Sequence, residues 1–138
     1  MSASIAVLLT FTAWTLALTA VYVGYRVALV LSFKEKANAW TRGAPSHVDP
    51  AWVTRFQHAH LNCVENLPLF AAIVLAAQAL GQGGVIDGLA WVYMGFRFAQ
   101  SIVHLVSTTP LFVFLRANML LGQWVCLVYW LWSLCSAA

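Results

Sequence analysis

The chain of 138 residues is 62% hydrophobic and only 8% charged, with a formal net charge of +3. A soluble domain carries about 25% charged residues, so this composition excludes an ordinary water-soluble protein and indicates a lipid bilayer as the solvent. The small, dispersed positive charge argues against nucleic acid as a partner. Since a membrane-spanning helix needs about 20 residues, the length predicts one domain, residues 1–138, with four such helices.

Residues 4–33 form the first predicted helix, because this apolar stretch ends only at the charged run Lys34-Glu35-Lys36. A secretory signal starts with basic residues and has an apolar region of about 7–15 residues, and this stretch has neither feature. We therefore expect a membrane helix that the mature protein retains.

The second predicted helix covers residues 50–80. Asp49 is expected to cap it, and Pro50 to occupy its first position, where the missing N–H of proline costs nothing. The glycine-rich segment after residue 80 ends this helix. It lacks the Lys and Ser/Thr of a phosphate-binding loop, so we expect a simple turn.

The third and fourth predicted helices cover residues 85–106 and 110–136, and Pro110 repeats the start signal of the second helix. The predicted fold is an all-α integral membrane protein, a four-helix transmembrane bundle, antiparallel, with one long loop and two short ones. Because basic residues gather in and beside the first loop, the positive-inside rule places the first and third loops in the cytoplasm.

Four charged side chains lie where lipid-facing residues are expected: Arg26, Glu65, Arg97 and Arg116. A charge at a helix centre costs roughly 2.5–3.5 kcal/mol on insertion scales, so each one needs a partner or a wet cavity. At a rise of about 1.5 Å per residue, all four fall in the cytoplasmic leaflet. We therefore expect one shared pocket that opens toward the cytoplasm.

Polar side chains form stripes at helical spacing on the same helices. The second helix carries Arg55, His58, Asn62 and Glu65, the third carries Arg97, Gln100 and His104, and the fourth carries Arg116 and Gln123. Several bases thus meet one acid, which predicts a small anionic guest, with a carboxylate or a thiolate, bound by guanidinium groups. The alternative is structural: Glu65 forms an ion pair with Arg97 or Arg55 and locks the bundle.

The three cysteines predict neither a disulfide framework nor a metal site. They are odd in number, no CxxC motif is present, and His60 with Cys63 is too small a ligand set. We expect them to be small buried hydrophobic residues, and we expect no metal cofactor.

The run from Arg55 to Phe70, RFQHAHLNCVENLPLF, resembles the signature of the MAPEG family, the membrane-associated proteins in eicosanoid and glutathione metabolism. That signature is Arg-x-x-Arg-Ala-x-x-Asn-x-x-Glu, followed by an apolar run with an early proline. The matching residues are Arg55, Ala59, Asn62, Glu65 and Pro68, and the likeness extends to Arg97 and Arg116. Two positions depart from the family pattern, since His58 replaces the second arginine and His104 replaces a common tyrosine.

The resemblance implies a homotrimer that binds glutathione, as co-substrate, between neighbouring subunits near the cytoplasmic face. It implies that Arg116 is the catalytic residue, which stabilises the glutathione thiolate. The residues expected to bind glutathione are Arg55, His58, Asn62, Glu65, Arg97, Gln100, His104 and Arg26. For Arg26 a second possibility is that its long side chain snorkels to the membrane interface.

Three functions are compatible with these features. The first is a membrane-bound glutathione transferase, whose thiolate attacks a lipophilic electrophile or a lipid hydroperoxide and so serves detoxification. The second is a non-catalytic lipid-binding scaffold of the same family. The third, from outside the family, is a small four-helix exporter, although such transporters usually rely on an acidic residue in the first helix, where this chain has Arg26.

Overall fold

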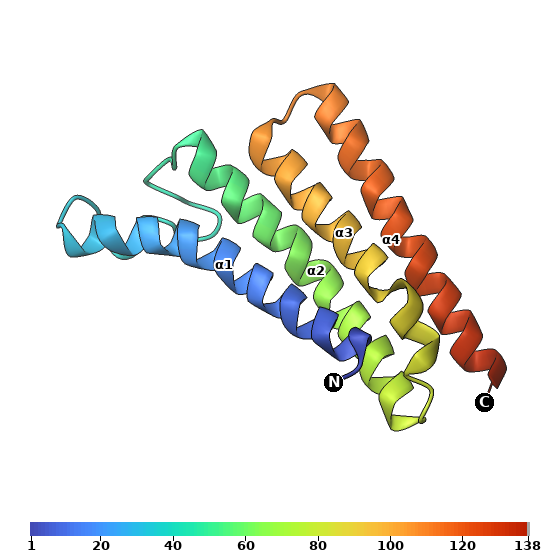
Figure 1. Ribbon diagram of the computed structural model, residues 1–138. Coiled ribbons are helices and arrows are strands. Elements are labelled where there is room, and N and C mark those ends of the chain that lie inside the picture. The colour runs from blue at the N-terminus through green and yellow to red at the C-terminus, as the bar shows by residue number, and fades with distance from the viewer. Residues whose placement is uncertain (138) are drawn as a thin grey trace.

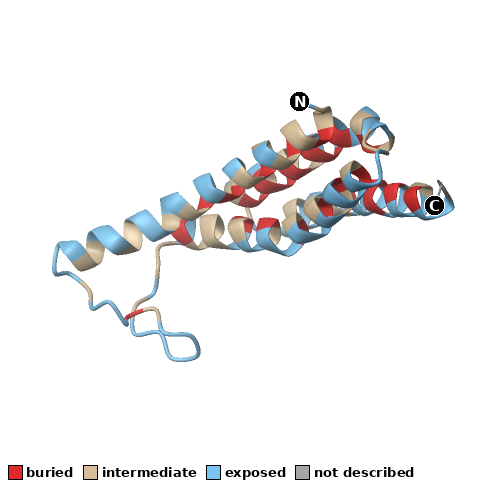
Figure 2. Ribbon diagram, turned by 90° about the horizontal axis from the view of Figure 1, so that it is seen from below, coloured by how far each residue is buried: buried red, intermediate tan, exposed pale blue. Residues whose placement is uncertain are grey.

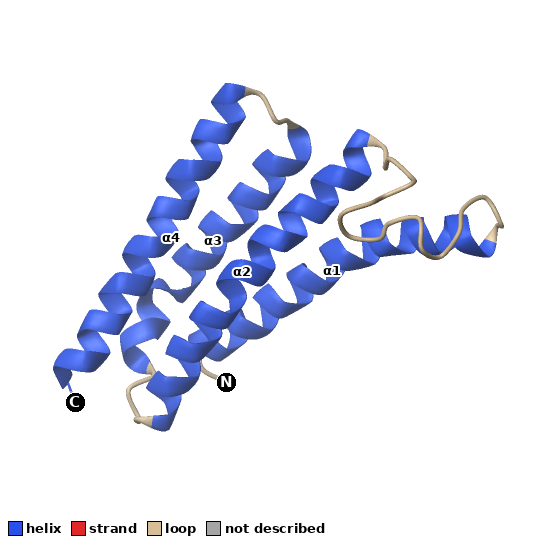
Figure 3. Ribbon diagram, turned by 180° about the vertical axis from the view of Figure 1, so that it is seen from behind, coloured by secondary structure: helices blue, strands red, loops and turns tan. Residues whose placement is uncertain are grey.

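A computed structural model describes residues 1–137 and contains four helices in that part of the chain, with no strand (Figures 1 and 3). They are α1 (Ala3–Leu31), α2 (Ala51–Ala79), α3 (Gly84–Val106) and α4 (Pro110–Ala137). The all-α prediction is therefore confirmed. Helices α1, α2 and α4 are long and apolar enough to cross a membrane. Helix α3 does not meet the same criterion, but short connections join it to α2 and α4 and it runs antiparallel beside them (Figure 1).

The helices lie side by side in the order of the chain, and successive helices run in opposite directions (Figures 1 and 3). Helix α3 packs against all three others, whereas α1 and α4 do not touch each other. Helix α2 likewise packs against all three others, so α2 and α3 lie at the centre of the bundle. The polar stripes of the sequence lie mainly on these two central helices.

The apolar core lies in the half of the bundle that holds both chain termini (Figure 2). Its centre is aromatic: the Phe70 and Tyr93 rings stack with centroids 4.5 Å apart, and the Trp130 ring centroid lies 5.7 Å from that of Tyr93. The buried residues of α1 end at Leu18. Beyond Leu18, α1 still packs on α2 through the Tyr22 and Tyr25 rings, which lie against His60 and Trp52. The end of α1 and the long loop lie away from the apolar core (Figure 2).

Every predicted helix boundary lies within two residues of the observed one, and two of the differences have an evident local cause. Helix α1 ends at Leu31, two residues earlier than expected, and Phe33 beyond it adopts a positive φ of 55°. Helix α2 begins at Ala51 with Pro50 in the capping position, and no side chain caps it. The prediction of Asp49 as the cap is wrong, because the Asp49 carboxylate is hydrogen-bonded elsewhere.

Asp49 holds the long loop against α1 and α2. Its Oδ2 accepts hydrogen bonds from Nη2 and, at 2.9 Å, from Nε of Arg26, and its Oδ1 accepts one from Trp40 Nε1 at 2.8 Å. Arg26 Nη2 also donates to Gln57 Oε1 at 2.9 Å. The Asp49 side chain is only 5% exposed. We call Arg26, Trp40, Asp49 and Gln57 the loop clamp.

Asp49→Asn is expected to destabilise the protein by about 1–3 kcal/mol, because it leaves the Arg26 guanidinium without its anionic partner. The loop of residues 32–50 should also become more sensitive to protease. Thermal unfolding in detergent and limited proteolysis measure the two effects. Glu35→Gln is the matched control: it removes the half-exposed loop pair between Glu35 and His47, worth about 0.2–1 kcal/mol. Equal effects of the two variants would contradict the loop clamp.

Candidate functional site

Arg97 is fully buried, and no carboxylate within residues 1–137 pairs with it. Its Nη1 donates to Gln100 Oε1 at 2.8 Å and to the Asn62 backbone oxygen at 3.2 Å. Its guanidinium carbon lies 5.2 Å from the centre of the Phe11 ring, at cation–π distance. Within residues 1–137 no ion pair involves Arg97, and its Nε and Nη2 have no hydrogen-bond partner. A buried positive charge is thus held only by amides and an aromatic face.

A chain of amide hydrogen bonds connects Arg97 to helix α4. Gln100 Oε1 accepts a second hydrogen bond from Gln123 Nε2 at 3.1 Å, and Gln100 Nε2 donates to the Arg116 backbone oxygen at 3.4 Å. Gln100 and Gln123 are both buried, whereas Arg116 is half-buried. The backbone of Arg116 therefore joins the network that surrounds Arg97.

The polar stripes of α2 and α3 meet at two histidines. Asn62 Nδ2 lies 3.2 Å from His104 Nδ1, and the His58 and His104 rings have centroids 5.9 Å apart in an edge-to-face arrangement. The same Asn62 carbonyl that accepts from Arg97 also accepts from Asn66 Nδ2 at 3.0 Å. Asn62 thus links the histidine pair to the buried arginine.

Six of the nine predicted site residues belong to one connected group, which we call the Arg97 cluster. They are His58, Asn62, Arg97, Gln100, His104 and Arg116. Their convergence from three helices brings two arginines, two histidines and two amides together without any carboxylate among them. Such a group offers hydrogen-bond donors and positive charge, which suits an anionic ligand.

Glu65 and Arg55 stay outside the Arg97 cluster. Glu65 is exposed and Arg55 half-buried, and neither takes part in an ion pair within residues 1–137. The alternative that Glu65 locks the bundle by pairing with Arg97 or Arg55 is therefore wrong for the single chain. The rotation of α2 about its axis explains this: Asn62 faces α3, whereas Glu65 faces outward.

Glu65→Gln is expected to leave the thermal stability within about 0.5 kcal/mol of the wild type, as for an exposed side chain without a partner. If Glu65 contacts glutathione, the same variant should weaken glutathione binding. Thermal unfolding and a glutathione titration, both in detergent, separate these effects. A stable variant with unchanged affinity would remove Glu65 from the site, and a strongly destabilised one would contradict its exposed position.

Arg26 does not share a pocket with the other charges. Its guanidinium belongs to the loop clamp, with the Asp49 carboxylate and the Gln57 amide as partners and the Tyr22 and Trp40 rings beneath it. The expectation of one shared pocket for all four charges is therefore wrong for Arg26, as it is for the exposed Glu65. The sequence contained a signal for this pairing, since only two acids, Glu35 and Asp49, lie between the first two helices. Asp49 also matches a helix-capping pattern, and that local pattern favoured the wrong role.

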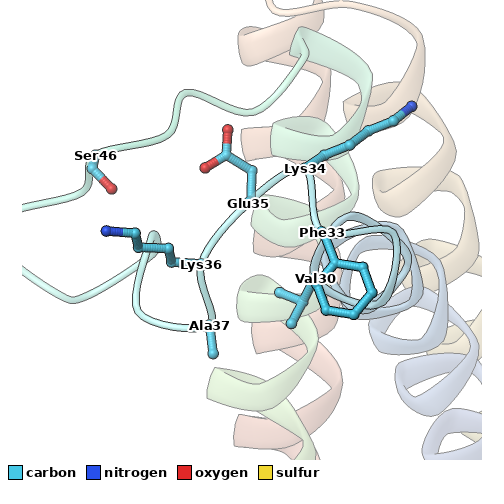
Figure 4. A pocket seen from close by; sticks show the side chains of 7 residues that line it. All are labelled: Val30, Phe33, Lys34, Glu35, Lys36, Ala37 and Ser46. Carbon is cyan, nitrogen blue, oxygen red and sulfur yellow. The ribbon is translucent and has the colours of Figure 1, made fainter.

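A cavity of about 750 Å³ lies at the free end of α1, beside the long loop (Figure 4). Its lining comes from the segment Val30–Ala37 and from Ser46, and includes none of the predicted site residues. The Lys34 and Lys36 side chains extend in different directions and do not converge on a common point (Figure 4). This cavity is therefore separate from the Arg97 cluster.

No group of three or more His, Cys, Asp or Glu side chains that could hold a metal ion is found among the described residues. Cys63 and Cys126 are buried and Cys135 is exposed, and all three are free thiols. The expectation of buried small hydrophobic residues is thus correct for the first two and wrong for Cys135, which lies on the outward face of the last turns of α4.

The family comparison covers nearly the whole chain. The model of the MAPEG family matches residues 3–136, which include all four helices and every residue of the Arg97 cluster. No curated protein and no solved structure matches the chain.

Proposed function

Because this chain belongs to the MAPEG family, we propose that it is a membrane-bound glutathione transferase. In this proposal the chain activates the thiolate of glutathione, which attacks a lipophilic electrophile or a lipid hydroperoxide. The family includes glutathione transferases and synthases as well as non-enzymatic members, so the activity must be argued from the site.

The observation that carries the proposal is the uncompensated positive charge of Arg97. A buried cation without a partner costs several kcal/mol, and proteins retain such groups chiefly where they serve a function. Two guanidinium nitrogens without hydrogen-bond partners, close to amides and histidines, favour a carboxylate-bearing ligand. Glutathione is such a ligand, with two carboxylates and a thiol.

The proposed roles follow the chemistry of each side chain. Asn62, Gln100, His58 and His104 supply hydrogen bonds to the peptide, and Arg97 supplies positive charge. Arg55 and Glu65 extend the site at its open edge. Arg116 acts on the sulfur: a guanidinium beside a thiol favours the charged form, lowers the thiol pKa and raises the fraction of nucleophile at neutral pH. The thiol proton leaves to solvent. The sulfur then bonds to the electrophile while the electrophile's bond to its leaving group breaks and that group departs with the electron pair; in a lipid hydroperoxide the O–O bond breaks and the lipid alcohol leaves.

The second reactant is proposed to arrive from the bilayer. The first turns of α4 around Arg116 present exposed apolar side chains, among them Leu111 and Phe114. A lipophilic molecule dissolved in the membrane can reach Arg116 along this surface. Holding both reactants at one place removes the entropic cost of their encounter, which adds to the activation of the thiol.

The proposal includes a homotrimer and an orientation of the chain in the membrane. Glu65 and Arg55 lie on an outward surface of α2, so a neighbouring copy in a homotrimer could close the site over them. The first and third loops, and with them the end of the bundle nearest Arg116, are proposed to face the cytoplasm, because the first loop and its edges carry Lys34, Lys36 and Arg42. Glutathione would then enter from the water side and the electrophile from the lipid side.

A glutathione titration of the detergent-purified protein tests the proposal. The ultraviolet absorbance of the thiolate is followed at neutral pH as glutathione is added. We expect a saturable signal that S-methylglutathione, which fills the same site but has no thiol, displaces. Cross-linking in the same detergent measures the oligomeric state.

The other outcomes are equally informative. Binding of S-methylglutathione without any thiolate signal would mean a glutathione-binding protein that does not activate the thiol. No binding of either compound would favour the non-catalytic lipid-binding scaffold. The exporter alternative has lost its support, because it came from outside the family to which the chain belongs.

A further inference from the structure

Gln123 occupies a buried position that connects two elements of the proposed site. It lies on α4 with no exposed surface, and its Nε2 donates both to Gln100 Oε1 and to the Met119 backbone oxygen, each at 3.1 Å. Gln100 in turn donates to the Arg116 backbone oxygen. Gln123 therefore touches Gln100 directly, and reaches Arg116 through it.

The chemistry of the donors determines which way the Gln100 carboxamide points. The Arg97 guanidinium can only donate, so the Gln100 atom that faces it must be the oxygen. The Gln123 atom that faces the Met119 carbonyl must likewise be its NH₂ group. Both constraints present the oxygen of Gln100 to two donors, and this turns the Gln100 NH₂ group toward Arg116.

The first turns of α4, which carry Arg116, precede the buried part of this helix. No residue between Pro110 and Gly122 is buried, so Gln123 is the first residue at which α4 enters the core. Next to it, Gly122 lets α4 approach α3 closely, since a Cβ at this position would lie 2.9 Å from the tip of the Phe96 ring. Arg116 lies about two turns before Gln123, and the hydrogen bond from Gln100 to its backbone oxygen ties it to α3.

We infer that Gln123 is a positioning residue for the reaction, acting through Gln100 on the place of Arg116. This inference rests on the proposed function. A guanidinium that stabilises a thiolate must be held within about 0.5 Å of its productive position, and a misplacement of about 1 Å can lower the rate about 100-fold. Gln123 does not touch the glutathione that we propose, and its effect is confined to the orientation of Gln100 and Arg116.

The test compares two glutamines that make similar contacts. Gln123→Met removes the donor to Gln100 and keeps the length of the side chain. Gln78→Met is the matched control, because Gln78 Nε2 also bonds between helices, to Ser2 Oγ and Ser4 Oγ at 3.1 Å, but at the far end of the bundle. The full-length protein in detergent is assayed for kcat and KM with a nitro-activated aryl chloride as electrophile, and for the pH titration of the bound thiol.

Gln123→Met should lower kcat by about 10-fold or more and move the pKa of the bound thiol toward that of free glutathione, with the KM for glutathione within about threefold. Gln78→Met should leave kcat and the titration unchanged. Where Gln123→Met does not fold, Gln123→Glu keeps size and polarity but places an acceptor against Gln100 Oε1, and should give the same loss.

Arg116→Ala, measured alongside, separates the two levels of the argument. If Arg116→Ala loses the thiolate signal but both folded Gln123 variants keep wild-type kcat and titration, the positioning role is overturned and the proposed function stands. If Arg116→Ala keeps the thiolate signal, the assignment of Arg116 is overturned, and the role of Gln123 with it.

Discussion

Arg116→Ala is expected to lower kcat by about 10²–10³-fold, the loss found when one donor to a developing charge is removed. The reason is that Arg116 is the half-buried cation whose backbone is tied to the Arg97 cluster, while its side chain forms no ion pair within residues 1–137. Folding should be nearly unaffected, because neither neighbour of Arg116 in the chain is buried. Steady-state kinetics and thermal unfolding of the same preparation measure the two quantities.

Two controls sharpen this result. Arg42→Ala removes an exposed arginine of the long loop and should leave kcat unchanged. Arg116→Lys keeps the positive charge without the planar fork, and should recover only part of the activity. Wild-type turnover in Arg116→Ala would remove this arginine from the mechanism, whatever its effect on glutathione affinity.

Arg97→Met is expected to fold at least as stably as the wild type while losing about 100-fold or more of the activity. Replacement of buried charges by apolar residues of similar size is often neutral or stabilising, by about 1–4 kcal/mol. Here the methionine would pack beside Phe11. Both acceptors of Arg97 retain another hydrogen bond, Gln100 Oε1 from Gln123 and the Asn62 carbonyl from Asn66. The melting temperature should therefore stay the same or rise, while kcat falls.

Arg97→Lys provides the comparison, since it keeps the buried charge but loses the fork. We expect it to be less stable than Arg97→Met, because an ammonium is more strongly hydrated than a guanidinium and costs more to bury. A large loss of stability in Arg97→Met, with normal turnover of the remaining folded protein, would mean that Arg97 is a structural residue.

The cluster could be predicted in outline because its members repeat at helical spacing. Asn62 on α2 and Arg97, Gln100 and His104 on α3 were each expected on an inward face, and the structure connects them. The partners could not be predicted. Glu65 was expected to meet an arginine, and it faces outward, since a rotation of the helix by a single residue decides between these outcomes.

The role of Asp49 shows the same limit in a loop. Its position before Pro50 is a local capping signal, and local signals compete with contacts from distant parts of the chain. Arg26, 23 residues earlier, offers the carboxylate an ion pair and two hydrogen bonds, which exceed what one helix cap supplies. The long-range partner therefore prevails, and α2 begins without a side-chain cap.

The sequence by itself determined four apolar helices, their order and the faces that carry polar side chains, because length, hydropathy and periodicity are properties of each segment alone. Only the tertiary structure decided that Arg26 pairs with Asp49, that Arg97 has no counter-charge within residues 1–137, and that Gln100 bonds to both Gln123 and the Arg116 backbone. These outcomes depend on the rotation of each helix against its neighbours and on the path of one long loop. Both are set by the packing of the whole bundle rather than by any segment of it.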